Sequence, residues 1–140
     1  MENLTKKGVE IESIKLASAI ARFLDDNKAK DITILDVSNV SSLSDYFIIA
    51  TATSTPQIRG LTELVRKNIK DIFKRLPLGE ETERTSKWNL LDYGEVVVHI
   101  MHGEQREIYK IEKFWSHALI VERDVWEKES KEFAKYEQIT

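Results

Sequence analysis

Apolar residues recur at helical spacing in the first part of the chain. Between residues 10 and 27 they return every three or four positions, at Ile11, Ile14, Ala17, Ile20, Ala21 and Leu24. This spacing places one apolar stripe on one side of an α-helix. The helix should end at residues 25–27, because Asp and Asn side chains bond to the backbone and compete with the helical ladder. We expect the stripe to face a sheet.

Two short runs rich in β-branched and aromatic residues follow, as is typical of strands. They are residues 31–37 (DITILDV) and 45–52 (DYFIIATA), and a polar link over residues 38–44 separates them. The second run is apolar almost throughout, the pattern of a strand covered on both faces. Helices should therefore lie above and below it.

A second helical pattern opens at Thr55-Pro56, where Thr can accept from an unpaired amide and Pro gives up only a donor that the helix does not use. Pro77 and Gly79 should end it near Leu76. Its apolar positions are Ile58, Leu61, Val65, Ile69, Ile72 and Leu76. Gly60 costs about 1 kcal/mol relative to Ala inside a helix, so we expect a close backbone approach or a ligand contact there.

The second half predicts a hairpin and a third helix. After a loop over residues 80–87, residues 88–91 and 95–101 form two strands, and Asp92-Tyr93-Gly94 makes the tight turn between them. The helix spans residues 104–115, with Ile108, Ile111 and Trp115 at helical spacing. We expect it to cap the sheet.

The last residues differ in composition. Residues 121–140 hold ten charged side chains and a sparse apolar stripe of Trp126, Phe133 and Tyr136. This pattern predicts an added helix that is either frayed or docked. The organisation is then one domain over residues 1–120 and a charged C-terminal extension over residues 121–140.

Together these elements predict an α/β fold, a mixed β-sheet with helices on both faces. The long helix makes a crossover between parallel strands, and the hairpins add antiparallel pairs.

Composition narrows the classes of protein. The chain has 140 residues, 41% hydrophobic and 32% charged, which fits a folded globular protein. Cys is absent, which excludes disulfides and thiolate metal sites. No apolar run approaches the length that spans a bilayer and the start lacks the apolar core of a signal peptide, so we expect a cytoplasmic location and no membrane partner. The net charge of -3 argues against a main role in holding phosphate backbones.

Candidate catalytic and metal-binding residues are few. His99 and His102 lie three apart but lack a third ligand of obvious geometry, so a structural role is favoured. Asp45, perhaps with Asp36, offers a carboxylate for Mg²⁺ and a nucleotidyltransferase-like activity, although the alternate position after it is Phe47; a turn or strand-end role is the preferred alternative. No Gly-x-Ser-x-Gly elbow or glycine-rich phosphate loop is present. We therefore predict a protein that is not an enzyme, with no cofactor and no metal.

Basic residues gather on the second helix. Arg66, Lys70 and Lys74 repeat every four positions and could touch RNA phosphates. A solvated face opposite the apolar stripe is the favoured alternative, because the acidic total dilutes any field.

The strongest constellation is one of interface-type residues around the hairpin. Aromatic residues and Arg dominate interface energetics because they bury much area and keep a polar handle. Trp115 can equally belong to the core, whereas Tyr93, at a turn tip, should be exposed. The set is Trp88, Leu90, Leu91, Asp92, Tyr93, Gly94, His99, Arg106, Tyr109 and Trp115.

These segments resemble the ribosomal silencing factor or Iojap family. The motifs that carry the resemblance are DITILDV at 31–37, SDYFIIAT at 44–51, KWNLLDYGEVVVHI at 87–100 and REIYKIEKFW at 106–115. The third is the most specific, with Trp, then Leu-Asp-Tyr-Gly, an acidic residue, valines and His.

The resemblance implies a fold similar to nucleotidyltransferases without that activity. It also implies binding to the large ribosomal subunit through its fourteenth protein, which blocks subunit joining and lowers translation when nutrients are short. A minor contact with ribosomal RNA and a homodimer are both compatible with it. The resemblance assigns the contact with the ribosomal protein to Trp88, Leu90, Leu91, Asp92, Tyr93 and Gly94, and further to Arg106, Tyr109 and Glu112.

Overall fold

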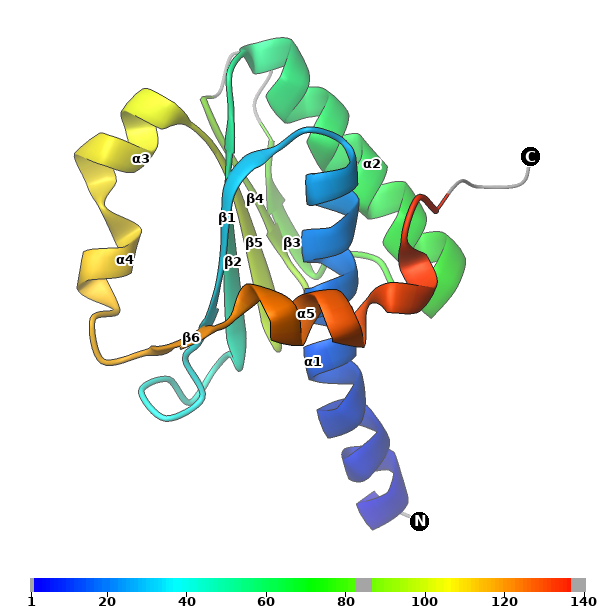
Figure 1. The fold of residues 1–140 in the computed structure, drawn as a ribbon. Coiled ribbons are helices and arrows are strands. Elements are labelled where there is room, and N and C mark those ends of the chain that lie inside the picture. Colours follow the sequence, from blue (N-terminus) through cyan, green and yellow to red (C-terminus); the bar gives the residue numbers. More distant parts are fainter. Residues whose placement is uncertain (1, 83–86, 137–140) are drawn as a thin grey trace.

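The fold is an α/β sandwich built on one mixed sheet (Figure 1). The structure is a computed structural model that describes residues 2–82 and 87–136, and their side chains apart from those of residues 2–12 and 114. Its elements are α1 (Glu2–Asp26), β1 (Lys30–Asp36), β2 (Tyr46–Ala52), α2 (Thr55–Phe73), β3 (Gly79–Glu81), β4 (Trp88–Asp92), β5 (Val96–His102), α3 (Gly103–Tyr109), α4 (Ile111–Phe114), β6 (Leu119–Val121) and α5 (Arg123–Glu129), followed by a 3₁₀ turn at Lys131–Phe133.

The sheet has the order β3-β4-β5-β2-β1-β6. β2 and β5 are parallel, and the other neighbouring pairs are antiparallel, which confirms the predicted mixed sheet. β2 lies in the middle, so its nearly continuous apolar run is covered on both sides. Part of the predicted loop over residues 80–87 is instead β3, while residues 83–86 lie outside the described residues.

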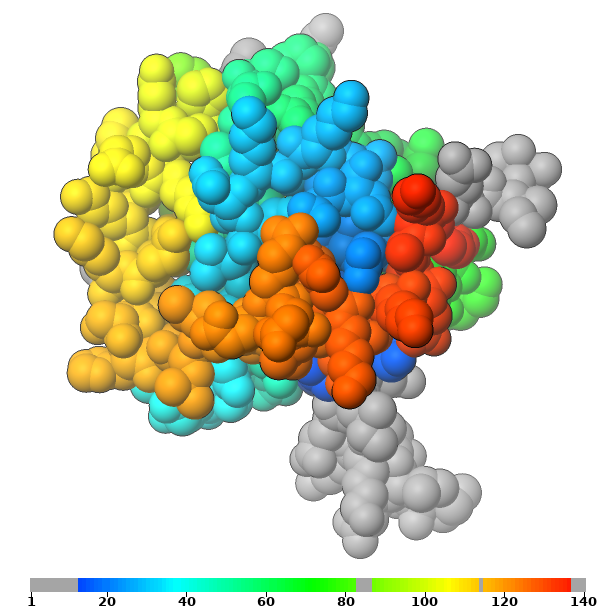
Figure 2. Space-filling view, viewed as in Figure 1, coloured from blue at the N-terminus to red at the C-terminus, as the bar shows by residue number. Residues whose placement is uncertain are grey.

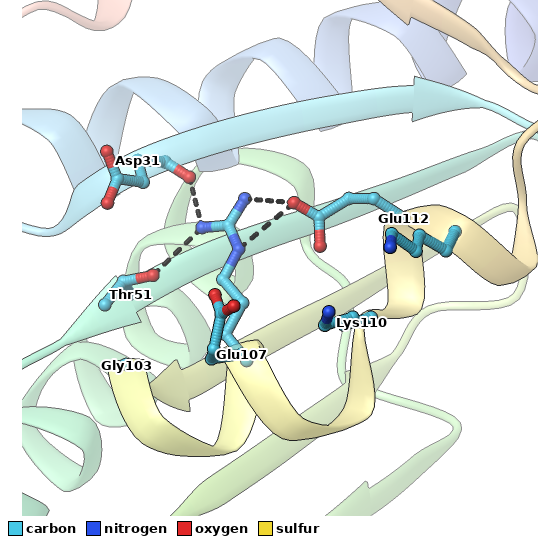
Figure 3. A pocket seen from close by; sticks show the side chains of 8 residues that line it. Asp31, Thr51, Gly103, Glu107, Lys110 and Glu112 are labelled. Atoms are coloured by element: carbon cyan, nitrogen blue, oxygen red, sulfur yellow. Dashed lines mark hydrogen bonds and ion pairs between the residues drawn. The ribbon is translucent and has the colours of Figure 1, made fainter.

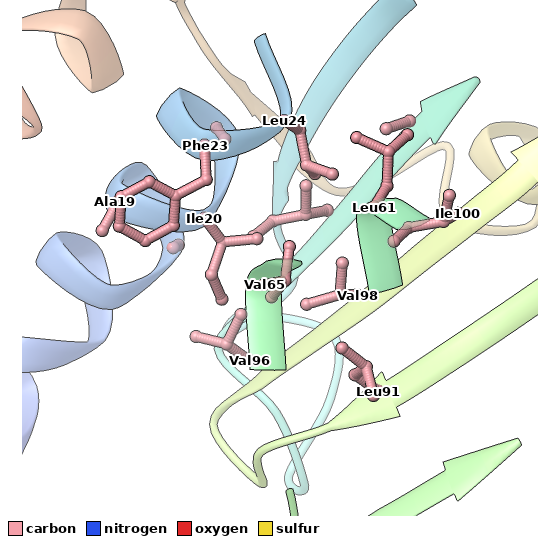
Figure 4. Packing of buried hydrophobic residues seen from close by; sticks show 14 of the residues in the cluster. Ala19, Ile20, Phe23, Leu24, Leu61, Val65, Leu91, Val96, Val98 and Ile100 are labelled. Atoms are coloured by element: carbon pink, nitrogen blue, oxygen red, sulfur yellow. The ribbon is translucent and has the colours of Figure 1, made fainter. Parts of the chain in front are cut away.

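The main core lies between the sheet and the helices α1 and α2 (Figure 4). Most of the predicted stripe of α1 is confirmed: Ala17, Ile20, Ala21 and Leu24 have no exposed surface and Ile14 is half-buried. The side chain of Ile11 lies outside the described residues, and the helix begins at Glu2, earlier than predicted. The fully buried residues of the stripe pack with inward residues of β5 such as Val96 and Val98, which are equally buried. Burial of this apolar stripe orients α1 on the sheet.

The opposite face of the sheet carries α3 and α4, so helices cover both faces as predicted. The single helix expected over residues 104–115 is wrong, because the chain breaks at Lys110, whose φ is 47°. An unbroken helix would hold Ile108 and Ile111 on one side. The break instead buries Ile111 against the sheet while Ile108 stays 70% exposed.

The C-terminal segment is docked rather than frayed. β6 pairs with β1, so the expected boundary after residue 120 falls inside a strand of the sheet. Trp126 and Phe133 belong to the main core, and Arg22 of α1 donates to the main-chain oxygen of Glu127 at 2.7 Å. In Figure 2 this segment lies directly against the rest of the molecule.

α2 differs from the prediction in its N-cap residue, in the residue at which it ends and in the surroundings of Gly60. Ser54, not Thr55, is the N-cap and accepts from the amide of Gln57, and the helix ends at Phe73 because Lys74 is left-handed. The close approach expected at Gly60 is wrong, since a Cβ there would meet nothing within 4 Å. No helix of the described part of the chain combines the length and apolarity needed to cross a membrane.

Candidate functional site

Alternation along the strands separates two sets of side chains around the hairpin. Trp88 and Leu90 of β4 share one face with Val97 and His99 of β5, whereas Leu91 points to the main core. Because successive side chains of a strand point to opposite faces, the predicted contact residues of β4 are divided between two surfaces.

The first set lines a hollow of about 300 Å³ on the face that carries α3 and α4. We call it the aromatic hollow. Apolar surface makes up nearly all of its lining, contributed by three strands and the α3–α4 segment. Its residues are Phe47, Trp88, Leu90, Val97, His99, Tyr109, Ile111 and Trp115.

The rings of the hollow form a continuous chain of contacts. Trp115 packs edge-on against Phe47 with centroids 4.8 Å apart, and Phe47 packs against His99 at 5.5 Å. Trp88 then lies 5.8 Å from His99 and 5.0 Å from Tyr109. Tilted and edge-to-face pairs at such distances are favourable beyond the area that they bury. The aromatic hollow is thus a preformed apolar surface, with Tyr109 50% exposed at its rim.

His99 is the most polar group of the hollow and is only 6% exposed. Burial lowers its pKa to about 4, so the ring is neutral at pH 7. Its Nδ1 accepts a hydrogen bond from Trp88 Nε1 at 3.1 Å. In a neutral ring the other nitrogen then carries the hydrogen. Nε2 is buried and has no hydrogen-bond partner within the described residues.

Tyr93 and Leu91, both predicted contact residues, are buried, which corrects the prediction that Tyr93 is exposed at the turn tip. Tyr93 has no exposed surface and Leu91 has 1%. Both share the strand face of Asn89, whose amide donates to Thr62 of α2 at 3.1 Å. Burial raises the pKa of Tyr93 to about 12. Tyr93 is buried because the alternation of the strand continues through it and carries its ring under α2.

Asp92 and Gly94 build the turn. Gly94 has φ of 91°, a conformation that favours glycine in a tight turn, and its amide donates to the Asp92 carboxylate at 2.7 Å. Arg75 clamps the same turn: it pairs with Glu95 at 2.6 Å and donates to the main-chain oxygen of Tyr93 at 2.7 Å. Asp92 therefore holds the hairpin in shape, with its side chain on the same strand face as Leu90.

Arg106 and Glu112 form a structural clamp in a second, more polar pocket, which Asp31 and Thr51 also line (Figure 3). The guanidinium pairs with Glu112 at 2.8 Å and donates to Thr51 Oγ1 at 2.9 Å, to Thr33 Oγ1 at 3.0 Å and to the main-chain oxygen of Asp31. Its side chain is only 12% exposed. Planar, multidentate bonding of this kind fixes α3 and α4 against β1 and β2.

The carboxylates considered for Mg²⁺ are used within the fold. Ser13 donates to Asp45 at 3.2 Å, and Ser38 donates to Asp36 at 2.6 Å. Asp45 also precedes β2, whereas ligand sites of open α/β sheets lie at the carboxyl ends of the strands. Among the described side chains, those of residues 13–82, 87–113 and 115–136, no three His, Asp or Glu groups gather closely enough to hold a metal ion.

The basic ridge of α2 is partly neutralised. Arg66 pairs with Glu80 at 2.8 Å and also with Glu63. Lys67 pairs with Glu63 at 3.7 Å. These pairs weaken the field that RNA phosphates would meet and support the solvated-face interpretation.

Three lining residues, Phe47, Val97 and Ile111, were not in the predicted set of interface-type residues. His99 and Trp115 were in that set but were given no contact role. The alternation of residues 45–52 would have placed Phe47 on one face with Ile49, but only the pairing of β2 with β5 brings that face next to His99.

Known proteins resemble this chain over most of its length. The profile of a family described as "Ribosomal silencing factor during starvation" matches residues 10–139. A "Ribosomal silencing factor RsfS" of Haemophilus influenzae is 36% identical over 102 residues, covering 72% of this chain and 98% of that protein. The "Protein Iojap, chloroplastic" of Arabidopsis thaliana is 34% identical over 81% of this chain, which spans about half of it, 47%. A crystal structure of a Chromobacterium violaceum protein superimposes with a TM-score of 0.68 at 35% identity, covering 72% of this chain and 83% of that one.

Proposed function

This chain belongs to the ribosomal silencing factor family, and on that premise we propose that it represses translation by occupying the large ribosomal subunit. The contact is with the fourteenth protein of that subunit, at the face that meets the small subunit. A folded domain there prevents joining by steric exclusion when nutrients are short, and no bond is made or broken.

The observation that carries the proposal is the aromatic hollow. It offers Trp88 and Leu90 on β4 and Tyr109 at the end of α3, and buried aromatic anchors supply most of the energy of typical interfaces. The sheet keeps Trp88 and Leu90 in place before binding, which limits the entropy cost of association. We assign the contact to Trp88, Leu90 and Tyr109, with Asp92 beside them, while Leu91, Tyr93, Gly94, Arg106 and Glu112 support its shape.

Co-sedimentation with large subunits tests the proposal. Tyr109→Ala removes a half-exposed ring of the hollow and should weaken binding by about 1 to 4 kcal/mol. Ile108→Ala is the matched control, because Ile108 lies on the same short helix, is 70% exposed and does not line the hollow. A gradient assay of subunit joining should show less inhibition by the Tyr109 variant. Equal binding of the parent and Tyr109→Ala would show that the hollow is not part of the interface.

A homodimer is a further part of the proposal. β6 is an edge strand with Leu119 and Ile120 64% and 62% exposed, and exposed apolar edges tend to pair with another chain. Light scattering after size exclusion would give the mass directly. Ile120→Lys should shift a dimer to the monomer, whereas a parent that is already monomeric at high concentration would refute this part.

A further inference from the structure

His99 brings one unused hydrogen-bond donor into an otherwise apolar hollow. Its Nδ1 is occupied by Trp88 Nε1, which leaves the hydrogen on Nε2. Nε2 is buried without a partner within the part of the chain that the structure describes. A buried donor with no acceptor destabilises the fold by about 1 to 3 kcal/mol. Such a cost calls for an explanation, and a donor that becomes paired when a partner binds would provide one.

We propose that the aromatic hollow receives an apolar side chain from an extended segment of a ribosomal protein, and that His99 Nε2 donates a hydrogen bond to a main-chain carbonyl of that segment. This inference rests on the proposed function. The hollow holds about 300 Å³, which suits side chains rather than a helix, since a helix measures about 10 to 12 Å across.

The chemistry of the lining selects the acceptor. None of the eight lining residues is Lys or Arg, so a partner carboxylate would be buried without a counter-charge. A main-chain carbonyl is neutral and meets the neutral His99 ring without that cost. The same lack of cations disfavours nucleic acid, whose binding depends on phosphate neutralisation.

Access to Nε2 requires a lining side chain to move, and we assign this movement to Tyr109. Nε2 is covered in the free chain, and Tyr109 is the hollow's most exposed lining ring, on the short helix α3. Exposed side chains change rotamer within nanoseconds, so its turning does not slow binding. Insertion of the partner then replaces the contact between Tyr109 and Trp88 with contacts to the inserted side chain.

Three variants test the inference against salt-washed bacterial large subunits, with Kd measured by titration of the labelled chain. His99→Phe keeps a ring but removes both nitrogens, and we expect binding about tenfold weaker or more. His99→Gln supplies an acceptor for Trp88 and a donor for the partner, so it should stay within about threefold of the parent. Leu90→Ala alters the apolar lining without touching the imidazole and should weaken binding in its own right.

The outcomes separate the inference from the proposed function. Weaker binding by Leu90→Ala with parental binding by His99→Phe overturns the His99 bond and leaves the interface in place. Parental binding by both variants overturns the interface as well. If the Kd is the same for the parent and both variants but rises steeply with salt concentration, the contact is with RNA instead. Melting curves verify folding, and His99→Met replaces His99→Phe if the latter does not fold.

Discussion

Titration of His99 should make the stability of the fold depend on pH. Its pKa is lowered from 6.5 to about 4 by burial, so between these values the unfolded chain binds a proton that the folded chain does not. Stability therefore falls as the pH drops from 6.5 toward 4 and is constant above 6.5 as far as this group is concerned. At pH 5.0, which is 1.5 units below 6.5, the loss is roughly 1.5 × 1.36, or about 2 kcal/mol.

Urea unfolding at pH 7.5 and pH 5.0 measures this loss. Carboxylates also titrate in this range, but they do so equally in the parent and in His99→Gln. The difference between the two proteins therefore isolates the contribution of His99, and the variant should lose about 2 kcal/mol less than the parent. His117→Gln is the control, because it removes an exposed histidine and leaves the core intact. Equal losses in parent and His99→Gln would refute the buried, neutral state of this ring.

Three further substitutions test the packing. Gly60→Ala should stabilise the chain by about 0.5 to 1 kcal/mol in thermal unfolding, because an added Cβ meets nothing; destabilisation would mean that the helix is distorted there. Trp126→Ala should cost about 3 to 5 kcal/mol in urea unfolding, since the ring is 1% exposed in the main core, and a loss below 1 kcal/mol would show that the C-terminal segment is not docked. Tyr93→Phe should leave stability unchanged or raise it by about 1 kcal/mol, because the buried hydroxyl has no partner within the described residues; a loss above 1 kcal/mol would reveal a bond to water.

Family membership and the aromatic hollow support the same proposed function by independent observations. The match over residues 10–139 identifies the family, and the hollow is the surface that we propose for the contact. Asp36 and Asp45, the candidate Mg²⁺ ligands, lie at the amino-terminal end of β2 and accept hydrogen bonds from Ser38 and Ser13, which weakens the nucleotidyltransferase-like alternative.

Local pattern alone determined several elements of this protein. The sequence predicted the stripe of Ala17, Ile20 and Leu24 and the apolar run of β2, because each depends on the period of a single element. The positive φ of Gly94 was readable because a tight turn between strands requires it. Trp88, Leu90 and Tyr109 were chosen by residue type, and that choice agrees with the hollow.

The tertiary structure decided which residues share a surface. Tyr93 and Leu91 are buried because the strand face that they occupy meets α2, a fact that depends on the order of the strands. The break at Lys110 follows from the burial of Ile111 against the sheet, which no helical period indicates. The state of His99 depends on Phe47 and Trp88, which lie far from each other in the sequence. Such properties arise from contacts between elements, and a one-dimensional pattern carries no information on how elements meet.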